Sequence, residues 1–187
     1  MAISKVQSES INLADNFAFT GTVTGAGGIT EADQWCLSSG FSPGSNAETF
    51  INSGWARNIT TPFTKIGTGM TESSGIFSFP STGIYLIKLK LMLSADSVDQ
   101  RLMRGSVYVT TDDGTYDKVV YGMTSAYGSQ VSNQAYCTSA SDYMFDVTNT
   151  TTHKVKIYSS AAASGLTVRS DAADLASHVT FIRLGDT

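Results

Sequence analysis

The stretch GIFSFPSTGIYLIKLKLML, residues 75–93, decides the fold. In its second half every odd position is apolar, whereas the even positions include Lys88 and Lys90. This alternation is typical of a β-strand that buries one of its two faces. Pro80 closes the ladder of the strand before it, and Gly83 allows the turn between the two. The stretch therefore predicts two consecutive strands, of which the second is long and belongs to a core.

The same alternation recurs along the rest of the chain. It is found in four shorter segments, Ser106–Thr110, Tyr143–Val147, Lys154–Tyr158 and His178–Leu184. Turn-forming pairs such as Asp113-Gly114 and Ser164-Gly165 separate these segments. No long segment carries an apolar stripe with the period of about 3.6 residues that a helix would need. The chain is therefore expected to be all-β, with antiparallel strands in a sandwich or barrel.

Composition indicates one globular domain. Of the 187 residues, 41% are hydrophobic and 15% are charged, against about 25% charged in typical soluble domains. A chain of this length buries enough surface to fold without a metal or a disulfide. Cys36 and Cys137 stand in no motif, so two free thiols are expected. A disulfide would need their Cα atoms within about 7 Å, which the sequence leaves open.

Charge and hydropathy exclude two classes of partner. The net charge is −4, and Lys and Arg do not gather into the basic patch that a nucleic-acid groove needs. No stretch approaches the about 20 apolar residues of a membrane span, so membrane insertion is not expected. The N-terminus lacks the basic start and apolar core of a secretory signal. We expect assembly in the cytoplasm, or export by a route that the sequence does not show.

Residues 1–30 are expected to form an attachment arm with a Gly-rich joint, ahead of a domain over residues 31–187. Large apolar side chains alternate in this arm, and these are Ile11, Leu13, Phe17 and Phe19. A run rich in Gly and Thr follows over residues 20–29. Because exposed apolar groups favour contacts, the arm is expected to dock on its own domain, on sister chains or on a scaffold.

The sequence resembles a family signature, G-x-F-x-x-P-x-x-G-x-Y, whose fixed positions are matched by Gly75, Phe77, Pro80, Gly83 and Tyr85. This signature belongs to the complement globular-head and tumour necrosis factor (TNF) superfamily. The resemblance implies a ten-stranded jelly roll that assembles as a compact homotrimer, with one sheet of each protomer around the threefold axis. Segment 143–158 resembles the penultimate hairpin of that family, and segment 178–184 resembles its closing strand.

The resemblance also implies which strands meet at the axis. They would be 84–93, 154–158 and 178–184. The interface residues expected on this ground are Tyr85, Ile87, Leu89, Val155, Ile157 and Phe181. Tyr85, Ile87 and Phe181 are expected nearest the axis or in the adjoining core, and the alternative is that these three belong only to the core of the protomer.

The arm and the segments 33–55 and 67–70 resemble virion proteins of marine tailed bacteriophages. This implies a virion structural protein, assembled in the host cytoplasm, that decorates the capsid or forms a short fibre or knob and contacts other virion proteins through its arm. The alternative is a knob that binds a receptor or a host surface glycan through loops 112–116 or 125–133. A polysaccharide depolymerase ranks third.

Catalytic chemistry is not expected, and neither is a cofactor. His153 and His178 are the only histidines, and no nucleophile motif frames them. The carboxylate pair Asp112 and Asp113 precedes Gly114, which favours a hairpin turn over acid–base or calcium chemistry. Trp35 and Trp55 could stack on sugars, although aromatic residues of a sandwich usually belong to its core. The sequence therefore predicts a protein that assembles and binds, not an enzyme.

Overall fold

The computed structural model describes residues 28–57, 65–96, 98–127, 134–171 and 175–187. These residues form strands and no helix, so none of them belongs to a helix that could cross a membrane. The strands are β1 (Ala32–Leu37), β2 (Thr49–Phe50), β3 (Trp55–Arg57), β4 (Thr71–Ser73), β5 (Ile76–Ser78), β6 (Gly83–Asp96), β7 (Gln100–Thr110), β8 (Asp117–Ala126), β9 (Gln134–Val147), β10 (Lys154–Ala161), β11 (Leu166–Val168) and β12 (His178–Gly185). The arm residues Ile11, Leu13, Phe17 and Phe19 lie outside the described residues.

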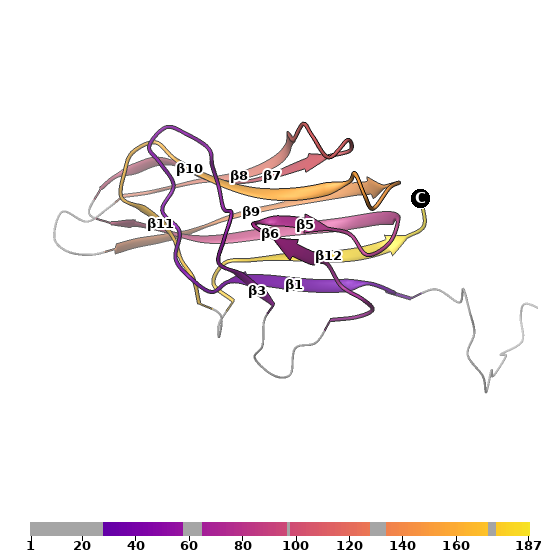
Figure 1. Cartoon of the computed structure of the whole chain (residues 1–187). Coiled ribbons are helices and arrows are strands. Elements are labelled where there is room, and N and C mark those ends of the chain that lie inside the picture. Colours follow the sequence, from indigo (N-terminus) through magenta and orange to yellow (C-terminus); the bar gives the residue numbers. More distant parts are fainter. Residues whose placement is uncertain (1–27, 58–64, 97, 128–133, 172–174) are drawn as a thin grey trace, which may run out of the picture.

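Two antiparallel sheets face each other, as Figure 1 shows. In sheet A the long strand β6 is central, with β9 along one edge and β12 and β11 along the other. The sheet continues from β12 through β1 to β3. In sheet B the central strand is β10, flanked by β7 and β8 on one side and by β5, β2 and β4 on the other. All five strands expected from alternation are present.

Segment 143–158 is not a hairpin, contrary to expectation. Strand β9 pairs with β6 in sheet A, whereas β10 pairs with β7, β5 and β2 in sheet B. The connection between β9 and β10 therefore crosses from one sheet to the other. Alternation and turn residues identify a strand and its end, but they do not tell which sheet the next strand joins.

The turn before β5 explains the first glycine of the signature. Ser74 and Gly75 both have positive φ, 52° and 81°, and they alone join β4 to β5. Two positive φ values in a two-residue loop define a type I′ hairpin turn, for which glycine is favoured. A Cβ on Gly75 would also clash with the carbonyl oxygen of Ile51. Gly75 is thus required both by the turn and by close packing.

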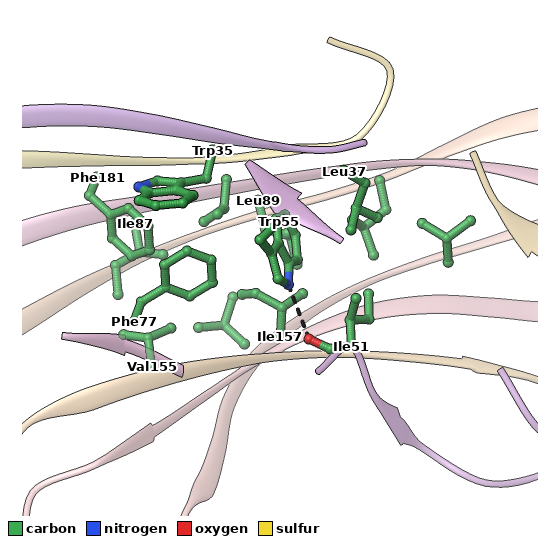
Figure 2. Packing of buried hydrophobic residues seen from close by; sticks show 14 of the residues in the cluster. Trp35, Leu37, Ile51, Trp55, Phe77, Ile87, Leu89, Val155, Ile157 and Phe181 are labelled. Atoms are coloured by element: carbon green, nitrogen blue, oxygen red, sulfur yellow. Dashed lines mark hydrogen bonds between the residues drawn. The ribbon is translucent and has the colours of Figure 1, made fainter. Parts of the chain in front are cut away.

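The six residues expected at a trimer interface lie in the core of the protomer. Tyr85, Ile87, Leu89, Val155, Ile157 and Phe181 are each at most 2% exposed. All six belong to the hydrophobic core cluster. Figure 2 shows five of them between the two sheets, beside Trp35, Trp55 and Phe77; the five are Ile87, Leu89, Val155, Ile157 and Phe181. Strand β10 lies in sheet B, so it does not share a face with β6 and β12. Because its own second sheet covers the apolar face of β6, that face needs no neighbouring subunit.

The sandwich is closed along one rim, where edge strands β8 and β9 of the two sheets meet. The Ser139 hydroxyl on β9 accepts from the Gly105 N–H at 3.0 Å and donates to the Gly122 carbonyl at 2.9 Å. A Cβ on Gly122 would clash with the backbone of Ala140. This rim leaves no space between the sheets.

Candidate assembly surface

The outward face of sheet A carries a row of apolar side chains. Register brings together one residue from each of four adjacent strands, and a bridge to the loop before β4 adds a fifth. We call this set the apolar row, and its members in order are Ile66, Ala32, Ile182, Leu86 and Met144. Strands lie about 4.8 Å apart, so the row spans about 19 Å.

The ends of the apolar row are the most exposed. Met144 is 65% exposed and Ile66 is 45% exposed, whereas the three residues between them are partly buried. Leu184, also exposed, follows Ile182 on β12. Contiguous apolar side chains on an otherwise polar surface are typical of protein–protein contacts.

A polar row lies one step further along the same strands. Gln34 Nε2 donates to Thr180 Oγ1 at 2.8 Å, and Lys88 Nζ pairs with Asp142 Oδ2 at 2.8 Å. Both contacts are made within the protomer, and the Lys88 and Asp142 side chains are 48% and 54% exposed. An apolar strip beside a polar border has the arrangement of an interface core and its rim.

A signal for the apolar row was present in the sequence. The segment Ile84–Ile87 is apolar on both faces of its strand, unlike the part that contains Lys88 and Lys90. A strand that buries only one face needs polar residues on the other. Leu86 therefore marks apolar side chains on the outward face of this strand, which the odd positions alone do not reveal.

One end of the row is fixed by a loop folded over two carboxylates. Glu31 accepts from the Thr68 and Gly69 N–H groups at 3.1 and 2.9 Å, and Asp33 accepts from the Met70 N–H at 2.8 Å. These bonds hold the segment that begins with Ile66 against β1. Gly67 and Gly69 have positive φ values of 73° and 75°, which favour glycine in this loop.

Behind this loop Asp33 and Arg57 form an ion pair at 2.9 Å. The Asp33 side chain is 1% exposed, and its carboxylate also accepts from Trp35 Nε1 at 3.0 Å. The Arg57 guanidinium lies 4.6 Å from the centre of the Trp35 ring and donates to the Met70 carbonyl. The carboxylate is thus compensated by one cation and by several N–H donors.

The histidines and tryptophans singled out in the sequence have structural contacts. The His153 ring stacks on Phe145 at 5.5 Å, and the hydroxyls of Thr148 and Thr152 lie near its two nitrogens. His178 Nδ1 lies 2.9 Å from the Leu175 carbonyl oxygen. Trp35 and Trp55 are buried in the core, as expected for aromatic residues of a sandwich.

The carboxylate pair at 112–113 forms the predicted hairpin turn. Asp112 Oδ1 accepts from Thr110 Oγ1 at 2.7 Å and from the N–H groups of Gly114 and Thr115. The hydrogen bond from Thr110 lowers the pKa of Asp112, and the two backbone bonds add to this. Asp113 pairs with Lys154 of β10 at 2.6 Å. Within the described ranges no three His, Cys, Asp or Glu side chains gather as a metal site would require.

Cys36 and Cys137 are free thiols, as expected. Cys36 lies on β1 and Cys137 on β9, and β12 and β6 separate these strands in sheet A. Burial raises the pKa of both thiols.

Comparison with known proteins shows the fold. No family model matches the sequence, and no curated protein matches it. The chain is similar to crystallised murine APRIL, with a TM-score of 0.57 and 15% identity over 82% of this chain and 98% of that one. It is similar to Eiger TNF from S. frugiperda, with a TM-score of 0.57 and 15% identity over 85% and 95%. The PRD1 vertex protein P5 aligns at 16% identity over 85% and 100%, with a TM-score of 0.49. The first two likenesses confirm a TNF-like jelly roll.

Proposed function

We propose that this TNF-like jelly roll is a structural protein without enzymatic activity, and that it assembles as a homotrimer through the outward face of sheet A. The observation that carries the proposal is the apolar row, which the protomer leaves partly in water. Burying apolar surface contributes about 25 cal/mol per Å². In a closed assembly the apolar row of every subunit is buried against a neighbouring subunit, and the polar row beside it forms the rim of the contact.

The number of copies rests on the resemblance of the 75–85 signature, and the apolar row supports self-association. The row replaces the six core residues as the proposed contact, because only outward side chains reach another subunit. Light scattering coupled to size-exclusion chromatography tests the proposal on the intact chain. We expect three times the chain mass of 19.8 kDa, unchanged on dilution. A monomer or a dimer at every concentration would overturn it.

The proposed setting is a bacteriophage virion, either as capsid decoration or as a short fibre or knob. Its support is the resemblance of the arm and of segments 33–55 and 67–70 to phage virion proteins. The chain enters β1 at Ala32, which is itself a member of the apolar row. Subunits that meet through this row therefore bring the starting points of their arms to one side. Three weak contacts made from one side add up to firm attachment.

Removing residues 1–24 tests the role of the arm. We expect the truncated protein to remain a trimer, at three times its own shortened chain mass, and to lose incorporation into virions, because the arm carries the contact with other virion proteins. The measurement is the amount of the protein in purified particles from complemented infections. Incorporation at the level of the intact chain would show that the arm is not the anchor.

A further inference from the structure

The outward face of sheet B carries aromatic and cationic side chains in alternation. One row across the strands runs through Phe50, Tyr158, Ser106 and Tyr121, and the next through Ile76, Lys156, Tyr108 and Lys118. We call this surface the aromatic–cationic face. Its aromatic and cationic members are Phe50, Arg104, Tyr108, Tyr116, Lys118, Tyr121, Lys156 and Tyr158.

Cations on this face lie over aromatic rings. The Arg104 guanidinium is 4.7 Å from the centre of the Tyr121 ring, and Lys118 Nζ is 5.6 Å from it. Lys156 Nζ lies 3.7 Å from the Tyr116 ring centre. Tyr121 is nonetheless 49% exposed. An aromatic ring framed by cations and half open to water can stack on a ligand that also carries negative charge.

Glu48 is the carboxylate that contacts the cations Arg104 and Lys118 of this face. It accepts from Arg104 at 3.2 Å, from Ser106 at 3.0 Å and from Lys118 at 3.2 Å, and Tyr108 donates to it as well. Burial raises the pKa of Glu48, but these hydrogen bonds outweigh burial and hold the pKa below its usual range. Glu48 therefore stays charged at neutral pH and cancels one of three positive charges. Near Tyr116 the carboxylates Asp112 and Asp113 and the cation Lys154 together add one negative charge, so the face keeps one net positive charge in a chain whose net charge is −4.

Beside Arg104 the surface is hollowed by about 210 Å³. Its lining includes Asn46, Glu48, Arg104 and Ser160. Among the described residues, two buried polar atoms of this lining, Arg104 Nε and Ser160 Oγ, have no hydrogen-bond partner. The buried hydroxyl of Tyr116 on the same face also has none within the described part of the chain. Buried donors without partners are uncommon, and a ligand rich in acceptor oxygens would match them.

We propose that the aromatic–cationic face binds a carboxylated sugar of a glycan. The ring of this sugar packs on Tyr121 and its carboxylate faces Arg104 and Lys118, while the next sugar of the glycan enters the hollow, whose lining does not include Tyr121. Three features carry this inference together: the half-exposed ring, the excess of cations over carboxylates, and the unpartnered donors. The hollow is smaller than the about 300–1,000 Å³ of drug-sized sites, which suits a single sugar ring. The face belongs to sheet B, so the site does not depend on assembly through sheet A.

Isothermal titration of the intact protein tests the ligand class. The probes are trigalacturonate and 3′-sialyllactose, with methyl-esterified trigalacturonate and lactose as their neutral counterparts. We expect at least one acidic sugar to bind at least ~10-fold more tightly than its neutral counterpart, because hydrogen bonds from cations to a carboxylate are stronger than those to a neutral group. The acidic sugar that binds identifies the source. Equal binding of acidic and neutral forms, or no binding of any probe, would overturn the proposal.

Two variants separate stacking from charge. Tyr121→Ala and Lys118→Gln should each weaken binding of the acidic sugar by ~10-fold. Tyr127→Ala is the matched control, because Tyr127 lies just after β8, is 82% exposed and is outside the face. The Tyr127→Ala protein should bind the acidic sugar as tightly as the unchanged protein does. Equal affinity of Tyr121→Ala and Tyr127→Ala for the acidic sugar would disprove the site. So would dextran sulfate binding to both variants as tightly as the acidic sugar does, because the contact would then depend on charge alone.

Discussion

The Leu86→Glu protein is expected to run as a folded monomer. Leu86 lies inside the apolar row, between Ile182 and Met144, and its side chain points away from the core. In the monomer the new carboxylate reaches water. In the trimer each subunit would bury it without a partner, at a cost of about 3–5 kcal/mol per charge. Three such charges should abolish assembly at micromolar concentration, which light scattering reports directly.

Lys90→Glu is the matched control for this experiment. Lys90 lies four residues further along β6 on the same outward face, and it is exposed beyond the polar row. The control gains the same carboxylate and should remain trimeric. Circular dichroism confirms that both proteins keep their strands. A trimeric Leu86→Glu protein would remove the apolar row from the interface.

Loss of the Arg57 charge should lower the free energy of unfolding more than loss of a charge from an exposed ion pair does. In Arg57→Met the buried Asp33 carboxylate keeps its N–H donors but loses its cation. The Asp33 side chain is 1% exposed but that of Arg57 is 35% exposed, so the pair is only partly buried and loss of its cation should cost about 1–3 kcal/mol, a considerable share of the about 5–15 kcal/mol that stabilises a typical domain. The free energy of unfolding, measured by urea denaturation, should fall by that amount. Unfolding of an oligomer depends on concentration, so the proteins are compared at one concentration.

Lys88→Met provides the comparison with an exposed ion pair. The Lys88–Asp142 distance of 2.8 Å is close to the Arg57–Asp33 distance of 2.9 Å. Both members of the Lys88–Asp142 pair, however, face water. Exposed pairs contribute at most about 1 kcal/mol. If Arg57→Met and Lys88→Met lose the same stability, the Asp33 carboxylate does not depend on Arg57.

The strands of this fold could be predicted from local sequence, because a buried face leaves its period in the chain. The alternation of residues 85–93 and the signature of Gly75, Pro80 and Gly83 were sufficient for β5, β6 and the class of fold. Alternation does not tell what covers a buried face. The odd residues of β6 are covered by sheet B of the same protomer, and an interface would have produced the same pattern.

Contacts between distant segments could not be predicted from the sequence. Asp33 and Arg57 are 24 residues apart, and nothing near either residue predicts the other. Glu48 meets Ser106 across 58 residues, so the aromatic–cationic face appears only once β2, β7 and β8 are placed in sheet B. The sandwich also joins β9 and β10 to different sheets, a choice that depends on packing of the whole domain and not on the turn between them.

The rim at which Ser139 joins the two sheets limits how this protein can polymerise. The outer strand of an open sheet offers unpaired N–H and carbonyl groups to further strands, and this is how amyloid-like fibres grow. Here β8 and β9 are bound to each other through Ser139, and Gly122 lies directly against the backbone of Ala140. Strand addition at this rim is therefore blocked. Growth by strand addition would instead have to use the opposite edges of the two sheets, β3 and β4.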